Sequence, residues 1–129
     1  MSAEQAADWN SLLDKKYASK IGMFDWYLPN LGNASLAANP GNQTPYAITD
    51  DQLAKAKAFL LKLRPQIGMF GSSNQPLAQA MLAGDIVASP TGDLDIDLKL
   101  AGYDNFSSTI PKQGGIRWQE VACVCSASK

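Results

Sequence analysis

The chain of 129 residues contains no histidine. This absence removes the commonest general base and the commonest side-chain ligand of transition metals. The sequence also shows no nucleophile paired with a base and no glycine-rich phosphate loop. We therefore expect a protein that is not an enzyme, with no catalytic residue and no cofactor.

Cysteine is almost as scarce, with only Cys123 and Cys125, one residue apart. On a strand both side chains would point to the same face, and a bridge between them would be poorly shaped. Two thiols alone do not complete a zinc site. We expect two small apolar residues buried in a core strand. A redox role is the alternative, and a cysteine nucleophile would have no base partner.

Long apolar runs and excess positive charge are also missing. No stretch approaches the ~20 apolar residues of a membrane span. The 11 basic and 12 acidic residues give a net charge of −1, so nucleic acid is not an expected partner. The opening MSAEQAADWN has no signal-peptide character. This start favours a cytoplasmic protein or a fragment whose leader lies elsewhere.

A metal site finds little support. Asp93, Asp95 and Asp97 alternate in the segment GDLDID. A calcium loop needs an internal glycine turn and a distal glutamate, and both are absent from this segment. We expect no metal.

Strand-like and helix-like segments alternate along the chain. This order predicts an α/β fold with a three-layer, mostly parallel sheet and helices on both faces, as one lobe over residues 1–129. The clearest helix signal is a capping box of Thr49 and Gln52 before the spaced apolar residues Leu53, Ala56, Leu60, Leu61 and Leu63. We expect this helix to pack its leucines on the sheet. Strands are predicted at 20–24, 66–70, 85–89, 106–110 and 116–124, and helices at 3–17, 29–38, 50–63, 72–84 and 92–102. The last segment also alternates like a strand, and we favour a helix there because it lies between two predicted strands and ends in a glycine.

Candidate binding residues follow the strands at their carboxyl ends, where ligands bind in parallel sheets. Asp25, Trp26 and Tyr27 come directly after the first strand. An acid beside aromatic faces suits a cationic amine through charge pairing and cation–π attraction. In the alternative interpretation, Asp25 only caps the next helix and the aromatic rings fill the core.

Hydroxyl groups follow the second and third strands. Ser72 lies in GSSNQP, and Ser89 and Thr91 lie in SPTGD. They could hold an anion or carboxylate near a helix start, although capping alone also explains them.

Trp118 and Glu120 form a second candidate pair. They would share one face of a strand, so that ring and carboxylate could line one wall of a pocket. The preceding Gly114 and Gly115 allow a sharp bend or a close approach to a ligand. The alternative is a core tryptophan with a glutamate at the rim.

Four segments, in one register, resemble a known family. They are ADWNSLLDKKYASKIGMFDWYLPNLG (7–32), LLKLRPQI (60–67), LAQAMLAGDIVAS (77–89) and IPKQGGIRWQEVA (110–122). They are similar to the extracellular solute-binding proteins of ABC importers, in the branch that binds spermidine and putrescine. That family has two α/β lobes that close on a ligand.

The resemblance implies that this chain corresponds to the second lobe, without the first lobe, the incoming hinge strand and the C-terminal helices. It implies a periplasmic or extracellular protein that delivers a small, polyamine-like cation to an ABC permease. Trp118 and Glu120 match the ligand-facing aromatic and acid of the family. Glu120 departs from the aspartate of the polyamine binders, and Asp25 is the one local acid after the first strand, so another small amine is an alternative ligand.

The last strand raises a further expectation. In the family it would cross to the first lobe. Here we expect residues 116–124 either to fill the slot of the missing hinge strand in their own sheet or to pair with a second copy, with both cysteines buried. The alternative function is a freestanding interaction or dimerisation module without a transport role.

Overall fold

The computed structural model describes residues 1–127. Seven helices and strands appear in the order α1 (Ala3–Ala6), β1 (Ile21–Phe24), α2 (Tyr27–Ala38), α3 (Asp50–Leu63), β2 (Ile67–Gly71), α4 (Asn74–Ala83) and α5 (Leu94–Leu100). Three 3-10 turns join them: η1 (Trp9–Leu13), η2 (Lys15–Tyr17) and η3 (Arg64–Gln66). Within residues 1–127, no helix has the length and apolar character to span a bilayer.

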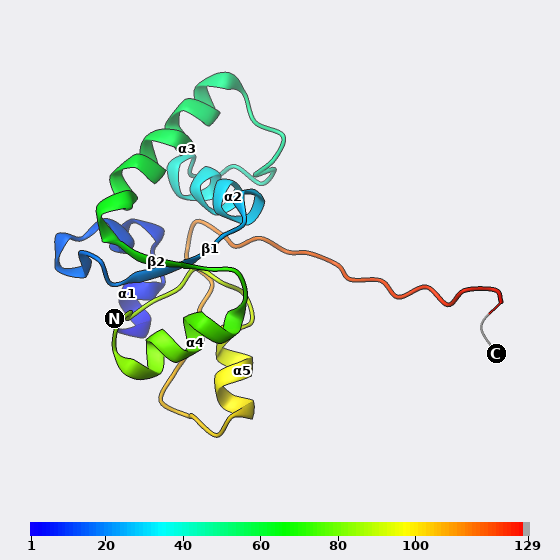
Figure 1. Cartoon of the computed structure of the whole chain (residues 1–129). Helices are drawn as coiled ribbons and strands as arrows, with labels where there is room; N and C mark the ends of the chain where they lie inside the picture. The colour runs from blue at the N-terminus through cyan, green and yellow to red at the C-terminus, as the bar shows by residue number, and fades with distance from the viewer. Residues whose placement is uncertain (128–129) are drawn as a thin grey trace.

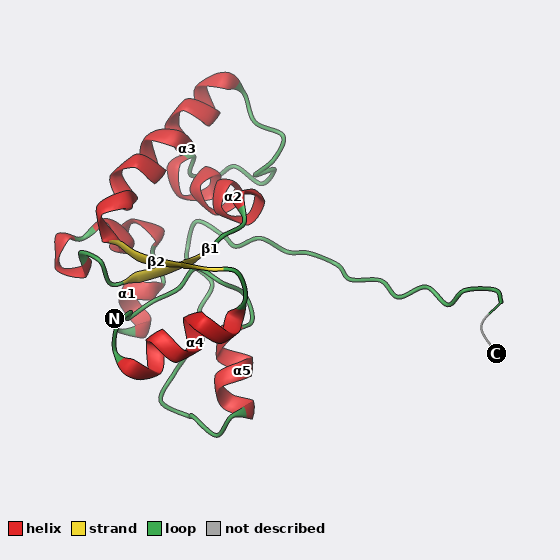
Figure 2. Cartoon of the chain, viewed as in Figure 1, coloured by secondary structure: helices red, strands yellow, loops and turns green. Residues whose placement is uncertain are grey.

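The sheet is small and parallel. β1 pairs with β2 from Ile21 opposite Ile67 to Phe24 opposite Gly71, and the other edge of β1 meets Ala88 in an isolated parallel bridge. Helices α2 and α3 lie on one side of this ribbon and α4 and α5 on the other (Figures 1 and 2). The prediction of an α/β fold with parallel strands and accompanying helices is confirmed at this level.

Two apolar clusters hold the helices to the sheet. The first joins β1 to α2, α3 and the N-terminal turns, and the second joins α4, α5 and Ile86. Gly22, in the middle of β1, has no room for a side chain, because an added Cβ would lie 2.5 Å from Ile86 and 2.8 Å from Leu77. Glycine at this position therefore lets the second cluster approach the sheet closely.

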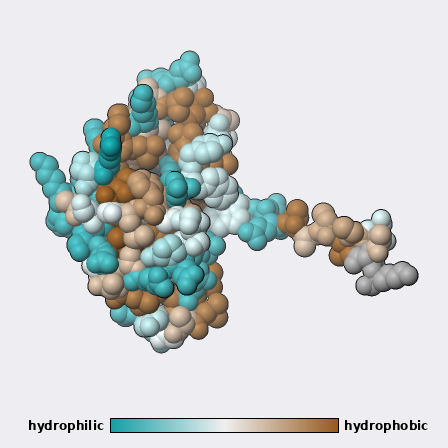
Figure 3. All heavy atoms as spheres, in the orientation of Figure 1, coloured by the Kyte–Doolittle hydropathy of each residue, from teal (hydrophilic) through white to brown (hydrophobic). Residues whose placement is uncertain are grey.

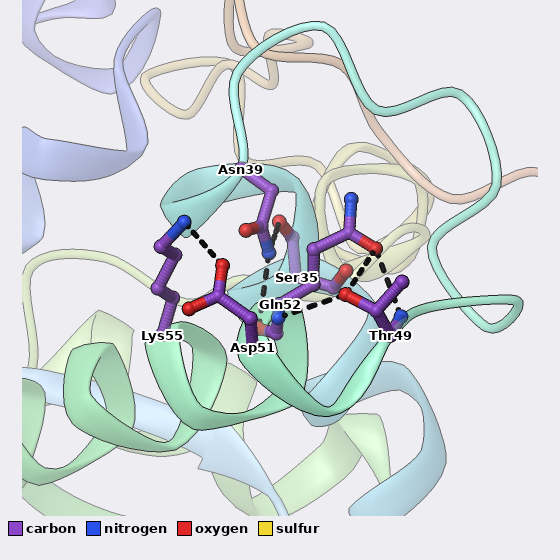
Figure 4. Close-up of polar contacts among 6 residues, drawn as sticks. All are labelled: Ser35, Asn39, Thr49, Asp51, Gln52 and Lys55. Carbon is purple, nitrogen blue, oxygen red and sulfur yellow. Dashed lines mark hydrogen bonds and ion pairs between the residues drawn. The ribbon is translucent and has the colours of Figure 1, made fainter.

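The start of α3 is fixed by the predicted capping box (Figure 4). The Thr49 hydroxyl accepts a hydrogen bond from the Gln52 backbone amide at 3.3 Å, and the Gln52 side-chain oxygen accepts one from the Thr49 backbone amide at 2.9 Å. The buried Asn39 side chain donates to the carbonyls of Ser35 and Gln52. Asn39 thereby ties the end of α2 to the first turn of α3.

The buried face of α3 differs from the predicted one. Ala56, Phe59 and Leu63 are buried and Leu60 is partly buried, whereas Leu61 is 60% exposed. Leu53 is also exposed, so the expectation that all the leucines pack on the core was wrong. Phe59 completes the spacing of three and four residues that one helix face requires.

This face gives a direct test of the packing. Phe59→Ala should lower the free energy of unfolding by about 3–5 kcal/mol, because a buried ring leaves a cavity. Leu61→Ala, on the exposed face of the same helix, is the matched control and should change it by about 0.5 kcal/mol or less. Denaturant titrations of both variants measure the difference, and equal losses would contradict the placement of α3.

Other helix predictions hold with shifted ends. α4 stops at Gly84, which adopts the left-handed conformation, and α5 forms where the helix over 92–102 was predicted. α2 begins at Tyr27, two residues before Pro29. Pro29 is tolerated there because amides of the first turn have no intrahelical partner.

The single amphipathic helix predicted over residues 3–17 is replaced by α1 and two 3-10 turns. The side chains of Asp8 and Asp14 accept the amides of Asn10 and Lys16, and each starts a new turn. Trp9 is nevertheless buried, as its place on the apolar face predicted.

Three predicted strands do not form. The strand over 85–89 is reduced to the bridge at Ala88, because the amides of Asp85 and Ile86 both donate back to the Ala80 carbonyl at the end of α4. Residues 106–110 are in no strand, since they have no backbone hydrogen bond to any other residue in 1–127.

The strand predicted over residues 116–124 is also absent. The chain leaves the body as an extended tail, and all residues from 119 to 127 are exposed (Figure 1). This tail does not fill a slot in its own sheet. Cys123 and Cys125 are exposed, so their predicted burial does not occur in the single chain.

Candidate ligand-binding edge

The carboxyl ends of the paired segments meet at one edge of the sheet. The Asp25 amide donates to the Gly71 carbonyl at 2.9 Å, which places the end of β1 beside the end of β2 and the following Ser72. On the other side of β1, the Asn33 side chain donates from α2 to the Pro90 carbonyl at 3.5 Å. The loops after both neighbours of β1 are therefore tied to this edge.

Asp25, Trp26 and Tyr27 face solvent at this edge. The Asp25 side chain has no hydrogen bond or ion pair with any residue in 1–127, and Trp26, not Asp25, occupies the N-cap position of α2. Trp26 and Tyr27 are 57% and 78% exposed. The interpretation that Asp25 caps the helix while the aromatic rings fill the core is therefore wrong.

Trp118 lies at the same edge, against the loop that follows Ala88. Its ring is so close to Gly92 that an added Cβ there would come within 2.3 Å of the Trp118 Cη2 atom. The ring is still 53% exposed. Two residues earlier, Ile116 packs on Gly32 of α2. A Cβ added to Gly32 would lie 2.7 Å from the Ile116 Cδ1 atom. These contacts hold Trp118 in place.

After Trp118 the chain turns away from this edge, so Glu120 does not lie at it. It lies on the exposed tail and has no hydrogen bond or ion pair within the described residues. The structure therefore brings Trp118, but not Glu120, to the loop that contains Ser89 and Thr91.

Ser89 and Thr91 turn their hydroxyl groups inward. Both hydroxyl oxygens are buried without a hydrogen-bond partner in residues 1–127, and both residues line a cavity of about 200 Å³. Residues 105–109 and the first three residues of the chain also line this cavity. Ser72, in contrast, is exposed after β2. The predicted hydroxyl set is thus divided between the open edge and the interior.

A contact that the sequence did not predict positions the whole segment before Trp118. Lys112 Nζ lies 2.7 Å from an Asp8 carboxylate oxygen, and the Gln113 side chain donates to the other at 2.5 Å. The Lys112 amide donates to the Ala7 carbonyl, and the Trp9 indole donates to the Gly114 carbonyl at 2.9 Å. We call this set of contacts between residues 7–9 and 112–114 the terminal clasp. Its partners are about a hundred residues apart in the sequence, so no local sequence pattern predicts it.

The clasp makes stability depend on pH. The hydrogen bonds from Lys112 and Gln113 hold the pKa of Asp8 well below its usual value. A depressed carboxyl pKa stabilises the fold above the unfolded-state pKa of about 3.9, and the contribution is lost as the pH falls below it.

We expect Asp8→Asn to lower the free energy of unfolding by about 1–2 kcal/mol at pH 7, because the charged hydrogen bonds are lost from a partly exposed site. The deficit should shrink as the pH is lowered from about 4 towards 2. Asp14→Asn is the matched control, since Asp14 also caps a 3-10 turn but has its ion pair with the nearby Lys16. Equal losses for both variants in denaturant titrations at pH 7 would refute the clasp.

The chain matches no protein-family model, no curated protein and no solved structure. The chemistry of the edge therefore has to support the functional argument. It offers the unpaired Asp25 carboxylate, three exposed aromatic rings and an exposed hydroxyl, a combination that favours a cation over an anion.

Proposed function

We propose that this chain is a three-layer lobe of a solute-binding protein and that it binds a small cationic amine at the carboxyl edge of its sheet. The observation that carries the proposal is the exposed, unpaired Asp25 carboxylate directly before Trp26 and Tyr27. A carboxylate without a partner can pair with an ammonium group, and exposed rings add about 0.5–1 kcal/mol each through cation–π attraction.

The position of Trp118 supports the proposal. Its ring contacts Gly92 in the loop after the segment that neighbours β1, which adds a third aromatic group to the edge where parallel sheets bind ligands. The resemblance of residues 110–122 to the polyamine-binding branch gives Trp118 the same role.

The edge forms one wall and not an enclosed pocket. Small-molecule sites normally bury most of the ligand surface, which one exposed wall cannot do. The two-lobed architecture of the resembling family would supply the opposite wall. In that architecture the complete protein would work outside the cytoplasm, in the periplasm or at the cell surface, and would deliver its amine to an ABC permease. By itself the lobe should bind weakly, with a dissociation constant on the order of millimolar.

Amine binding can be tested on the indole N–H signals of the three tryptophans. Addition of putrescine or spermidine should shift the signals of Trp26 and Trp118, whereas the signal of Trp9 should stay in place, because Trp9 is buried and bonded to Gly114. The neutral diol 1,4-butanediol, which has the length of putrescine without its charges, should cause no shift.

Asp25→Asn should weaken binding of the amine by about tenfold, the equivalent of one charge-assisted contact of about 1.4 kcal/mol. Asp50→Asn, the same change on an exposed residue at the start of α3, should leave binding unchanged. Equal shifts with the diol, or equal affinities of the two variants, would contradict the proposal.

A further inference from the structure

The cavity behind Ser89 and Thr91 lies at an unfinished edge of the sheet. Residues 87–91 meet β1 on one side, where Gly22 donates to the Ala88 carbonyl and Val87 donates to the Lys20 carbonyl. Residues 87–91 and residues 105–109 both line the cavity of about 200 Å³. We call the space between these two segments the slot.

Both segments that flank the slot have polar groups without partners. Within residues 1–127, neither the backbone nor the side chain of Ser89 or Thr91 takes part in a hydrogen bond. Residues 104–110 form no backbone–backbone hydrogen bond there either. The hydroxyl oxygens of Ser89 and Thr91 are buried without a partner, and the half-buried or exposed backbone groups of both segments are free to pair with an added strand.

The C-terminal tail has the complementary properties. Residues 119–127 are all exposed and extend from the body (Figure 3). Val121 and Val124 are 85% and 86% exposed. Valine favours strands, and an isolated extended segment leaves its amides and carbonyls unpaired. At ~3.3 Å per residue, residues 119–125 span roughly 23 Å, and the five residues of the slot wall span roughly 16 Å. The tail is therefore long enough to cover the slot wall.

The tail is poorly placed to enter the slot of its own chain. Trp118 is held against Gly92, next to the slot, and from there the chain points away from the body (Figure 1). To return, it would have to reverse within RWQEV, residues 117–121, which contains no glycine, proline, asparagine or aspartate. These are residues that tight turns favour.

We propose that the slot receives residues 119–125 of a second copy of this chain, so that two chains exchange their tails. Exchange of identical segments is a low-cost route to a dimer. The slot must widen to admit a strand. Residues 104–110 have no backbone–backbone hydrogen bond to the described body, so their outward movement requires only that the Ser108 hydroxyl leave Asp95 and that Phe106 leave the second apolar cluster. Asp25, Trp26 and Tyr27 lie outside the slot, whereas Trp118 of the proposed amine site lies beside it, so the exchange is tested by cross-linking and solution mass and not by amine binding.

Disulfide trapping tests the occupant. Ser107→Cys places a thiol on an exposed residue of the slot wall, where the tail thiols Cys123 and Cys125 can reach it. Ser73→Cys is the matched control, because Ser73 is also exposed and lies outside the slot. After mild oxidation, peptide mapping should find a bond between the introduced thiol and the tail with Ser107→Cys and several-fold less with Ser73→Cys.

Mixed labelling decides which chain supplies the tail. Chains with heavy and light nitrogen are unfolded together, refolded and then oxidised. Cross-linked peptides that combine both labels support exchange with a second copy. If every cross-linked peptide carries one label only, the tail fills the slot of its own chain. If the yield is no higher than with Ser73→Cys, the tail does not enter the slot. Either result overturns the proposal.

Solution mass provides a second measurement. The native chain should run at twice its mass of 13.8 kDa. Val121→Asp combined with Val124→Asp should halve that mass. The resulting monomer should unfold at the same temperature as the native monomer, because both valines are exposed in the single chain. A native chain that is monomeric at high micromolar concentration would also overturn the proposal.

Discussion

The pairing of β1 on both edges is the interaction on which the rest of the structure depends. This strand has only four residues, yet it pairs with β2 on one side and with Ala88 on the other. Ile21 and Met23 belong to the apolar cluster beneath α2 and α3, and Gly22 admits Ile86 and Leu77 from the opposite side. β2 joins the same two clusters through Ile67 and Met69, and it is held in place by its pairing with β1.

The candidate binding edge is a consequence of this central strand. Because its neighbours run parallel to it, the loops after all three segments meet at one end, and Asp25, Ser72 and the loop at Gly92 become neighbours. The terminal clasp then brings the last part of the chain across α2, so that Trp118 reaches the same edge. The proposed amine site depends on both contacts, one local to the sheet and one between distant segments.

The sequence could predict those features that rest on local chemistry. The capping box at Thr49, the glycine stop at Gly84 and the first two strands depend on neighbouring residues, and the structure confirms them. The strands predicted at 106–110 and 116–124 failed, because strand-forming side chains do not form a strand without a partner edge. Ser89 and Thr91 were placed after the correct segment, but only the tertiary structure shows that their hydroxyls turn inward.

Hydrogen exchange at the outer edge of β1 tests this account most directly. The amides of Gly22 and Val87 form the two hydrogen bonds that join residues 87–88 to β1. Both should exchange at rates close to that of global unfolding, whereas the amide of Gln43, which has no partner within residues 1–127, should exchange as in a free coil. If Val87 exchanged as fast as Gln43, residues 87–91 would not belong to the sheet. Trp118 and Asp25 would then share no common edge.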